Sequence, residues 1–120
     1  MDTTDIANLY YDAWINRGGD MSAVPLAADF AFRGPVASFD DAAGFRQMAA
    51  RAGAAVRSFR VRHQFSDGDL VCSVVDWEMS MVDGVLTAAE VLEIRDGVIV
   101  RGELIYDAEE LRAAMRAATS

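Results

Sequence analysis

The start of the chain carries apolar residues at the spacing of an amphipathic helix. Over residues 3–17 they form two adjacent rows, which predict a helix that is buried on a broad face and capped by Thr3 or Thr4. A second, short helix is expected over residues 22–28, because Pro25 then falls in its first turn, where the missing N–H costs little.

Residues 29–35 alternate between phenylalanine and smaller or polar side chains, which predicts a short strand that ends at a Gly-Pro pair. Asp40 or Asp41 is then expected to cap a third helix, and Gly53 is expected to end it.

From Val56 to Tyr106 the apolar period changes to two, in four runs separated by Gly-containing turns, which predicts an antiparallel meander. Asp107 and Glu110 have the spacing of a capping box for a terminal helix through Met115. This order of elements predicts an α+β fold whose helices cover one face of a strongly curved antiparallel sheet. A chain of 120 residues is expected to form a single domain, residues 1–120.

Hairpin geometry assigns the two faces of this sheet. A two-residue turn at residues 83–84 sets Trp77 opposite Glu90 and Val75 opposite Leu92. Glu90 is then the anomalous residue on an otherwise apolar inner face. The inner face of these two strands comprises Val71, Ser73, Val75, Trp77, Met79, Met81, Leu86, Ala88, Glu90, Leu92 and Ile94.

A three-residue turn around Gly97 pairs Ile94 with Val98 and sets Gly102 opposite Glu90. The last strand then adds Val100, Gly102, Leu104 and Tyr106 to the inner face. The outer face is too apolar to be fully solvated, so we expect a homodimer that forms through it. The residues behind this expectation are Cys72, Val74, Ala89 and Val91.

The composition and net charge of the chain disfavour or exclude several kinds of binding partner and chemistry. A formal charge of −8 disfavours nucleic acid and anionic membranes, since both are bound by clustered basic residues. All basic residues are arginine, which excludes Schiff-base chemistry at a lysine. The single cysteine, Cys72, cannot form a disulfide within the chain, and no leader pattern or long apolar stretch predicts export or a membrane span. We therefore expect a cytoplasmic location.

The sequence predicts neither a metal nor another cofactor. One histidine and one cysteine cannot build a zinc site, and the glycines form no phosphate-binding motif. Asp67-Gly68-Asp69 resembles a fragment of a calcium loop but lacks further spaced carboxylates, so we interpret it as a turn.

Five segments carry a family resemblance: Tyr11–Asp20 (YDAWINRGGD), Phe30–Pro35, Gly44-Phe45, Arg95–Ile99 and Ile105–Asp107. Together they resemble the nuclear transport factor 2-like superfamily, which includes ketosteroid isomerases, limonene epoxide hydrolases and SnoaL-type polyketide cyclases. The resemblance implies a cystatin-like, cone-shaped α+β barrel, usually dimeric, with a deep apolar cavity that takes a small molecule.

The resemblance also implies roles for single residues. Tyr11 falls where ketosteroid isomerases keep the tyrosine of their oxyanion hole, and Glu90 falls where they keep a protonated acid. Their general base would fall on Gly34, which carries no proton, so the steroid isomerase reaction lacks its base. The polar residues of limonene epoxide hydrolases fall on Val75, Trp77 and Leu104, which excludes that chemistry.

Three residues are candidates for acid/base chemistry. If Glu90 is buried it must become neutral or find a partner, whereas at the cavity mouth or on the outer face it is an ordinary hydrated carboxylate. His63 lies in the alternating row of residues 59–65, and it either points inward and replaces the missing base or is a core or rim histidine. Tyr11 is either a proton donor or a core residue bonded to a backbone carbonyl.

Two functions are consistent with these residues. In the first, the protein is a cofactor-free isomerase, cyclase or dehydratase for a small apolar molecule, with Glu90 and Tyr11 as donors and His63 as base. In the second, it is a non-catalytic ligand-binding or dimerisation module. The residues expected to line the cavity are Trp14, Phe32, Met48, Val75, Trp77, Met79, Leu92 and Tyr106.

Overall fold

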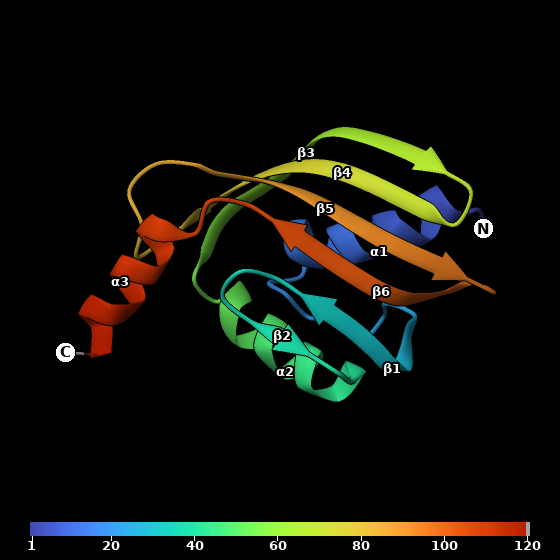
Figure 1. Ribbon diagram of the computed structural model, residues 1–120, viewed down its shortest axis with the longest axis horizontal. Helices are drawn as coiled ribbons and strands as arrows, with labels where there is room; N and C mark the ends of the chain where they lie inside the picture. The colour runs from blue at the N-terminus through green and yellow to red at the C-terminus, as the bar shows by residue number, and fades with distance from the viewer. Residues whose placement is uncertain (120) are drawn as a thin grey trace.

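Two helices pack against one face of a sheet, and a third helix lies beyond the end of the strands (Figure 1). The computed structural model describes residues 1–119. The helices are α1 (Thr3–Asn16), α2 (Ala42–Gly53) and α3 (Glu109–Thr119). The strands are β1 (Leu26–Arg33), β2 (Ser38–Phe39), β3 (Val56–Asp67), β4 (Leu70–Met79), β5 (Leu86–Arg95) and β6 (Val98–Ile105). The predicted α+β fold class is confirmed.

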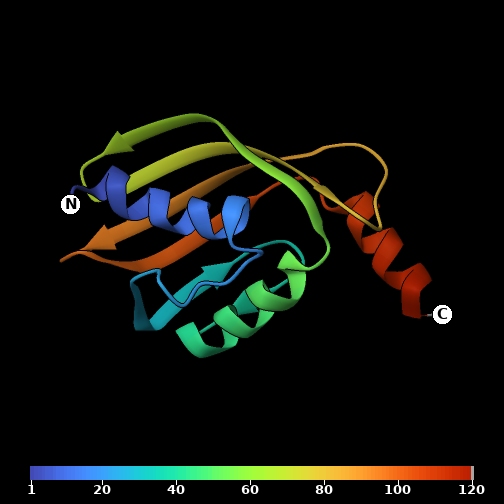
Figure 2. The same cartoon turned by 180° about the vertical axis from the view of Figure 1, so that it is seen from behind.

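The sheet is mixed, with the strand order β2-β1-β6-β5-β4-β3. The strands β3 to β6 form the predicted antiparallel meander, and β1 extends it by running parallel to β6. In this pairing Leu26 lies opposite Ile99 and Phe32 opposite Gly102. Seen from behind, α1 and α2 lie on the same face of the sheet, α1 across the meander and α2 across β1 and β2 (Figure 2). The sheet is thus antiparallel, as predicted, except where β1 joins it.

The prediction of a short helix over residues 22–28 is wrong. The structure has a turn at residues 22–23, and Leu26 already belongs to β1. The N–H of Ile99 donates a 2.8 Å hydrogen bond to the carbonyl of Pro25, so this segment is drawn into the sheet by β6. Its conformation depends on a strand near the end of the chain, and local spacing cannot show that.

Asp2 caps α1 in place of the predicted Thr3 or Thr4. Its carboxylate accepts the N–H of Asp5 at 2.9 Å, and the carboxylate of Asp5 accepts the N–H of Asp2 at 3.1 Å, which completes a capping box. The cap of α2 is Asp41, one of the two predicted residues.

α3 begins at Glu109, whose N–H donates to the side chain of Asp107 at 3.1 Å. The helix continues past the predicted end at Met115. Ala108, just before the helix, and Leu111 are buried, so α3 is attached to the rest of the domain by its first turn.

The strands β4 and β5 pair in a different register from the predicted one. Trp77 lies opposite Leu86 instead of Glu90, a shift of four residues, because residues 80–85 form a longer loop than the expected two-residue turn. The observed pairs include Val71 with Leu92, Ser73 with Glu90, Val75 with Ala88 and Trp77 with Leu86. A shift by an even number leaves each side chain on its face, so Glu90 stays inside. Met81 lies in the loop and is 44% exposed, but it still lines the cavity.

The turn between β5 and β6 has two residues, Asp96 and Gly97, with φ angles of 53° and 78°. Two successive left-handed residues make the tight turn that matches the twist of a hairpin, in place of the predicted three-residue turn. A bulge in β6 at Val100, opposite the step from Glu93 to Ile94 in β5, then shifts the pairing further. The observed pairs include Ile94 with Ile99, Leu92 with Gly102 and Glu90 with Leu104. As a result Ile99, and not Val100, takes the buried position on β6.

The loop that follows α1 lies directly on the end of α2. A Cβ at Gly53 would lie 1.9 Å from the carbonyl oxygen of Gly18, and a Cβ at Gly19 would lie 2.2 Å from that of Ala49. Neither position can hold a side chain without a shift of the backbone. This contact sets how α1 and α2 lie beneath the sheet.

The outer face of the sheet bears the apolar residues on which the homodimer prediction depends. The half-buried ones are Cys72, Val74, Ala89 and Val91. Phe65 and Ile105 are exposed on the same sheet, to 64% and 56%. Association through this face stays a prediction. In residues 1–119, no helix is both long and apolar enough to cross a membrane.

Candidate functional site

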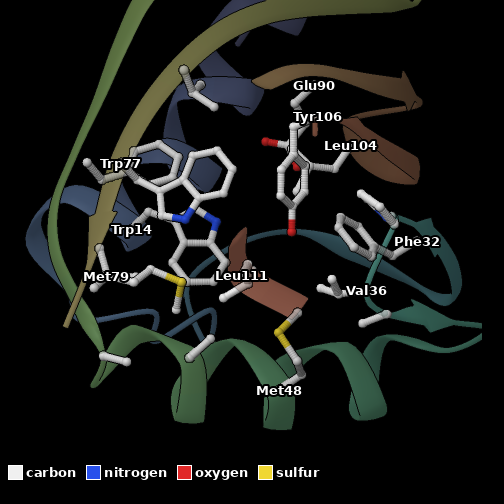
Figure 3. Close-up of a pocket in the computed structure, with 18 of the residues that line it drawn as sticks. Trp14, Phe32, Val36, Met48, Trp77, Met79, Glu90, Leu104, Tyr106 and Leu111 are labelled. Atoms are coloured by element: carbon white, nitrogen blue, oxygen red, sulfur yellow. The ribbon is translucent and has the colours of Figure 1, made fainter. Parts of the chain in front are cut away.

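A cavity of about 390 Å³ lies between the inner face of the sheet and the helices (Figure 3). Its volume falls in the range of small-molecule binding sites, and its wall is nearly all apolar. Of the residues predicted to line it, those on the wall are Trp14, Phe32, Met48, Val75, Trp77, Met79 and Tyr106. Leu92 is not on the wall: it is completely buried, and its side chain lies over Gly102.

Glu90 is the one acidic side chain on the cavity wall among residues 1–119. The alternation of β5 turns it inward between Ala88 and Leu92, and only 2% of its surface is exposed. Its Oε2 accepts a 2.8 Å hydrogen bond from the hydroxyl of Tyr10. Burial raises the pKa of Glu90 to about 7, although the neighbouring hydroxyls of Tyr10 and Tyr11 oppose the shift. At neutral pH this carboxyl is therefore divided between its protonated and ionised forms.

Tyr10 occupies the place for which the sequence analysis named Tyr11. Both tyrosines are buried on α1, but Tyr10 lines the cavity and bonds Glu90, whereas Tyr11 is not part of the wall. Because the apolar face of α1 is broad, the sequence pattern does not show which of two adjacent residues on it faces the cavity. Spacing from Trp14 does not decide between them, because Tyr10 is four residues and Tyr11 three residues from it, and both spacings share a side of a helix.

The hydroxyl of Tyr11 is buried and has no hydrogen-bond partner among the described residues. Burial raises the pKa of Tyr11 far above its usual value, and the nearby Glu90 raises it further, while Ser73 lowers it. Burial also raises the pKa of Tyr10, with Glu90 adding to the effect. Both phenols stay protonated at neutral pH, so both are hydrogen-bond donors beside Glu90.

His63 does not reach the cavity. It is exposed, lies opposite Val74 on the outer face, and its ring stacks on that of Phe65 with centroids 6.4 Å apart. The cause is a bulge between Val61 and His63, which turns the rest of β3 around. The hypothesis that His63 is the base is therefore wrong: Gln64 takes the inward position and donates to Ser73.

The side of the cavity formed by β3, β4 and α1 is aromatic. Phe59 stacks between Trp14 and Trp77, with centroid distances of 6.0 Å and 6.4 Å. The ring of Tyr106 lies edge-on to that of Trp77 at 5.1 Å, and Figure 3 shows its hydroxyl pointing into the cavity. Tyr106 thus supplies a further polar group in an apolar site, and burial raises its pKa.

The residues that line the open end of the cavity were not predicted from the sequence. The loop of residues 34–37 and the side chains of Leu111 and Met115 complete the wall there. The four-residue spacing of Leu111 and Met115 marked an apolar stripe on the terminal helix, which was a usable signal. Gly34 does lie on the wall, as the resemblance implied, and contributes no acid or base. Residues 1–119 contain no cluster of three side chains suited to binding a metal ion.

The chain belongs to the SnoaL-like domain family, whose model matches residues 7–102. This family assignment and the fold place it in the nuclear transport factor 2-like superfamily, as the sequence resemblance indicated. No curated protein matches the sequence.

Several solved structures are similar to the whole fold. A protein from Kribbella flavida is 26% identical, with a TM-score of 0.82 over 96% of this chain and 94% of that one. A nuclear transport factor 2-like protein of unknown function from Cytophaga hutchinsonii is 18% identical, with a TM-score of 0.81 over 93% and 96% of the two chains. A candidate polyketide cyclase from Sinorhizobium meliloti is 20% identical, with a TM-score of 0.74 over 88% and 100%.

Proposed function

We propose that this protein is a cofactor-independent enzyme that moves a proton on a small apolar carbonyl compound, in a reaction of the isomerase, cyclase or dehydratase type. The observation that carries the proposal is Glu90, a single carboxyl with a pKa of about 7 on the wall of an apolar cavity. A general acid or base works best when its pKa lies near the working pH, and a hydrated glutamate does not meet that condition.

Glu90 serves as both base and acid in this scheme, because His63 is outside and Gly34 has no side chain. In its ionised form Glu90 removes a proton from the carbon next to a carbonyl group, and the resulting acid returns the proton to another atom of the same molecule. Burial excludes water, which keeps the proton on Glu90 between the two steps.

The tyrosines assist in two ways. Tyr10 donates to Oε2 of Glu90 and so holds the carboxyl in one orientation. The hydroxyl of Tyr106 points into the cavity and is available to donate a hydrogen bond to the developing enolate oxygen. The likeness to a candidate polyketide cyclase supports a substrate with activated carbonyl groups.

Exchange of carbon-bound hydrogen tests the proposal without the natural substrate. The protein is mixed in D₂O near neutral pH with 2-tetralone, 2-decalone and cyclohexanone, and loss of the α-proton signals is followed by NMR. The wild type should accelerate exchange of at least one ketone, and Glu90→Gln should return the rate to that of buffer. His63→Gln should exchange like the wild type.

A matched pair of variants shows whether the cavity is the site. Ala52 lines the cavity and Ala50 is exposed on the same helix. Ala52→Phe should abolish exchange and Ala50→Phe should not. If the ketones bind, as judged by quenching of Trp14 and Trp77 fluorescence, but no exchange depends on Glu90, the alternative of a non-catalytic ligand-binding module is favoured.

A further inference from the structure

The open end of the cavity continues into a second hollow. The two share Pro35, Val36 and Met115 in their walls, and the second hollow adds the side chains of Arg112 and Arg116. These arginines are four residues apart on α3, so they lie on the same side of the helix. An apolar cavity thus opens directly onto a positively charged groove.

Among the residues that the structure describes, no ion pair neutralises the positive charge at this groove. Within residues 1–119 neither arginine forms an ion pair with a carboxylate, even though the chain as a whole carries a charge of −8. The acidic residues Glu109 and Glu110 occupy the first turn of α3 and are not paired with either arginine.

Arg112 is held in place at the groove. Its guanidinium donates a hydrogen bond to the carbonyl oxygen of Pro35, which anchors α3 to the loop at the cavity mouth without cancelling the charge. The charge of Arg112 also acts inside the cavity, because it lowers the pKa of Tyr106, although burial raises that pKa by more. A third arginine, Arg51, lies on the cavity wall itself.

We propose that the ligand of this cavity is an amphipathic carboxylate, whose apolar body fills the cavity and whose carboxylate binds Arg112 and Arg116 in the groove. The inference rests on the proposed function and specifies its substrate class: a carbonyl compound with an anionic end. Planar guanidinium groups match the geometry of a carboxylate, and an apolar body alone would leave two unpaired charges at the mouth.

Two non-reactive probes with the same apolar body test the proposal: 4-cyclohexylbutanoate and its neutral amide, 4-cyclohexylbutanamide. Both are transparent where tryptophan absorbs, and Trp14 and Trp77 line the cavity, so intrinsic fluorescence reports binding. Titrations are made at pH 6 and low ionic strength. Wild type is compared with Arg116→Gln, with Arg112→Gln/Arg116→Gln, and with Arg101→Gln, a control that removes an exposed charge from β6.

The carboxylate should bind wild type about tenfold more tightly than the amide, a preference that 0.5 M salt should largely remove. Arg116→Gln should reduce the preference about threefold and the double variant should abolish it, while Arg101→Gln should leave it unchanged. Affinity for the amide should be the same in wild type, Arg116→Gln and Arg101→Gln, which shows that the cavity and α3 remain intact in the single variants. In the double variant the ratio of the two affinities is compared, because loss of the hydrogen bond from Arg112 to Pro35 should weaken both probes alike.

The failures of the two proposals are distinguishable. Equal binding of carboxylate and amide would overturn the assignment of the ligand class and leave the apolar cavity as a binding site. A carboxylate preference that survives the double variant would overturn the role of Arg112 and Arg116. Binding of neither probe would overturn both this inference and the cavity as the site of the proposed reaction.

Discussion

Tyr10 and Glu90 are 80 residues apart in the chain, yet the hydroxyl of one lies 2.8 Å from a carboxyl oxygen of the other. The contact joins α1 to the middle of the sheet inside the core. Burial disfavours the ionised form of this carboxyl, whereas the hydrogen bond from Tyr10 favours it, so both protonation states are populated near neutral pH.

The stability of the protein should fall as the pH rises past neutrality. Burial raises the pKa of Glu90 from 4.5 to about 7, so the folded protein binds this proton more tightly than the unfolded chain does. The resulting stabilisation is complete below pH 4.5 and is lost as the pH rises through 7. It corresponds to roughly 3 kcal/mol, which urea unfolding at pH 5 and pH 8 should detect.

Glu90→Gln should remove most of that dependence on pH, and at pH 8 it should be more stable than wild type. Glu103→Gln, at an exposed position on β6, is the control and should keep the wild-type profile. Parallel profiles for wild type and Glu90→Gln would contradict a buried, titrating Glu90.

Tyr10→Phe and Tyr11→Phe should have different effects although the two residues are adjacent. Tyr10→Phe leaves Glu90 without its bonded donor, so the pKa of Glu90 should rise further, and stability at pH 8 should drop by about 1–3 kcal/mol. Tyr11→Phe removes a buried hydroxyl that has no bonded partner in the described part of the chain, so stability should change little. NMR titration of the Glu90 carboxyl carbon and thermal unfolding measure both effects; equal shifts would refute the distinction.

Exchange activity on ketones should depend on pH through Glu90 and not through the histidine. The rate should rise across pH 7 as Glu90 ionises, because only the ionised form removes a proton. His63→Gln should show the same rise, since His63 lies on the outer face. A pH profile that loses this rise in His63→Gln would return His63 to the mechanism.

Gly53→Ala should destabilise the fold by about 3 kcal/mol, because the added methyl group would lie 1.9 Å from the carbonyl oxygen of Gly18. Gly68→Ala tests the cost of backbone conformation alone. Gly68 has a φ of +59° but nothing within 4 Å of its Cβ position, so its loss should be about 1 kcal/mol. Urea unfolding compares the two, and equal losses would mean that the loop moves away from α2 at no cost.

If the homodimer predicted from the outer sheet face forms, Ile105→Glu should disrupt it. Ile105 is 56% exposed on β6, opposite Ala89. Val85→Glu places the same charge at an apolar residue that is 60% exposed in the β4–β5 loop, away from the strands. Sedimentation velocity should show a dimer for wild type and Val85→Glu and a monomer for Ile105→Glu. A monomeric wild type would refute the prediction.

Local pattern was enough to predict the helices α1 and α2, the meander and the inward position of Glu90, because those depend on periodicity and on the parity of the register. It was not enough where one extra residue changes parity. The bulge before His63 turned over the outer half of β3. The two-residue turn before β6 put Ile99 inside in place of Val100, and the bulge at Val100 then returned Gly102 and Leu104 to the inner face. Bulges respond to twist across the whole sheet, and a single strand does not reveal them.

The candidate site was less predictable than the fold for the same kind of reason. Choosing Tyr10 over Tyr11 requires the rotation of α1 about its axis, which is set by its contacts with the sheet. The positions of Arg112 and Arg116 depend on where α3 packs at the open end of the cavity. Both the rotation of α1 and the position of α3 are set by packing between distant segments. Apolar spacing could therefore predict that the two helices form, but not which of their residues face the cavity.

The parallel pairing of β1 with β6 has a consequence for how the protein is made. The segment that ends at Arg33 has to wait for residues 98–105 before its strand has a neighbour on that side. During synthesis most of the chain must therefore leave the ribosome before the sheet is complete, and contacts between such distant segments form slowly. Truncation before β6 should yield a chain with two unpaired strand edges and a tendency to aggregate.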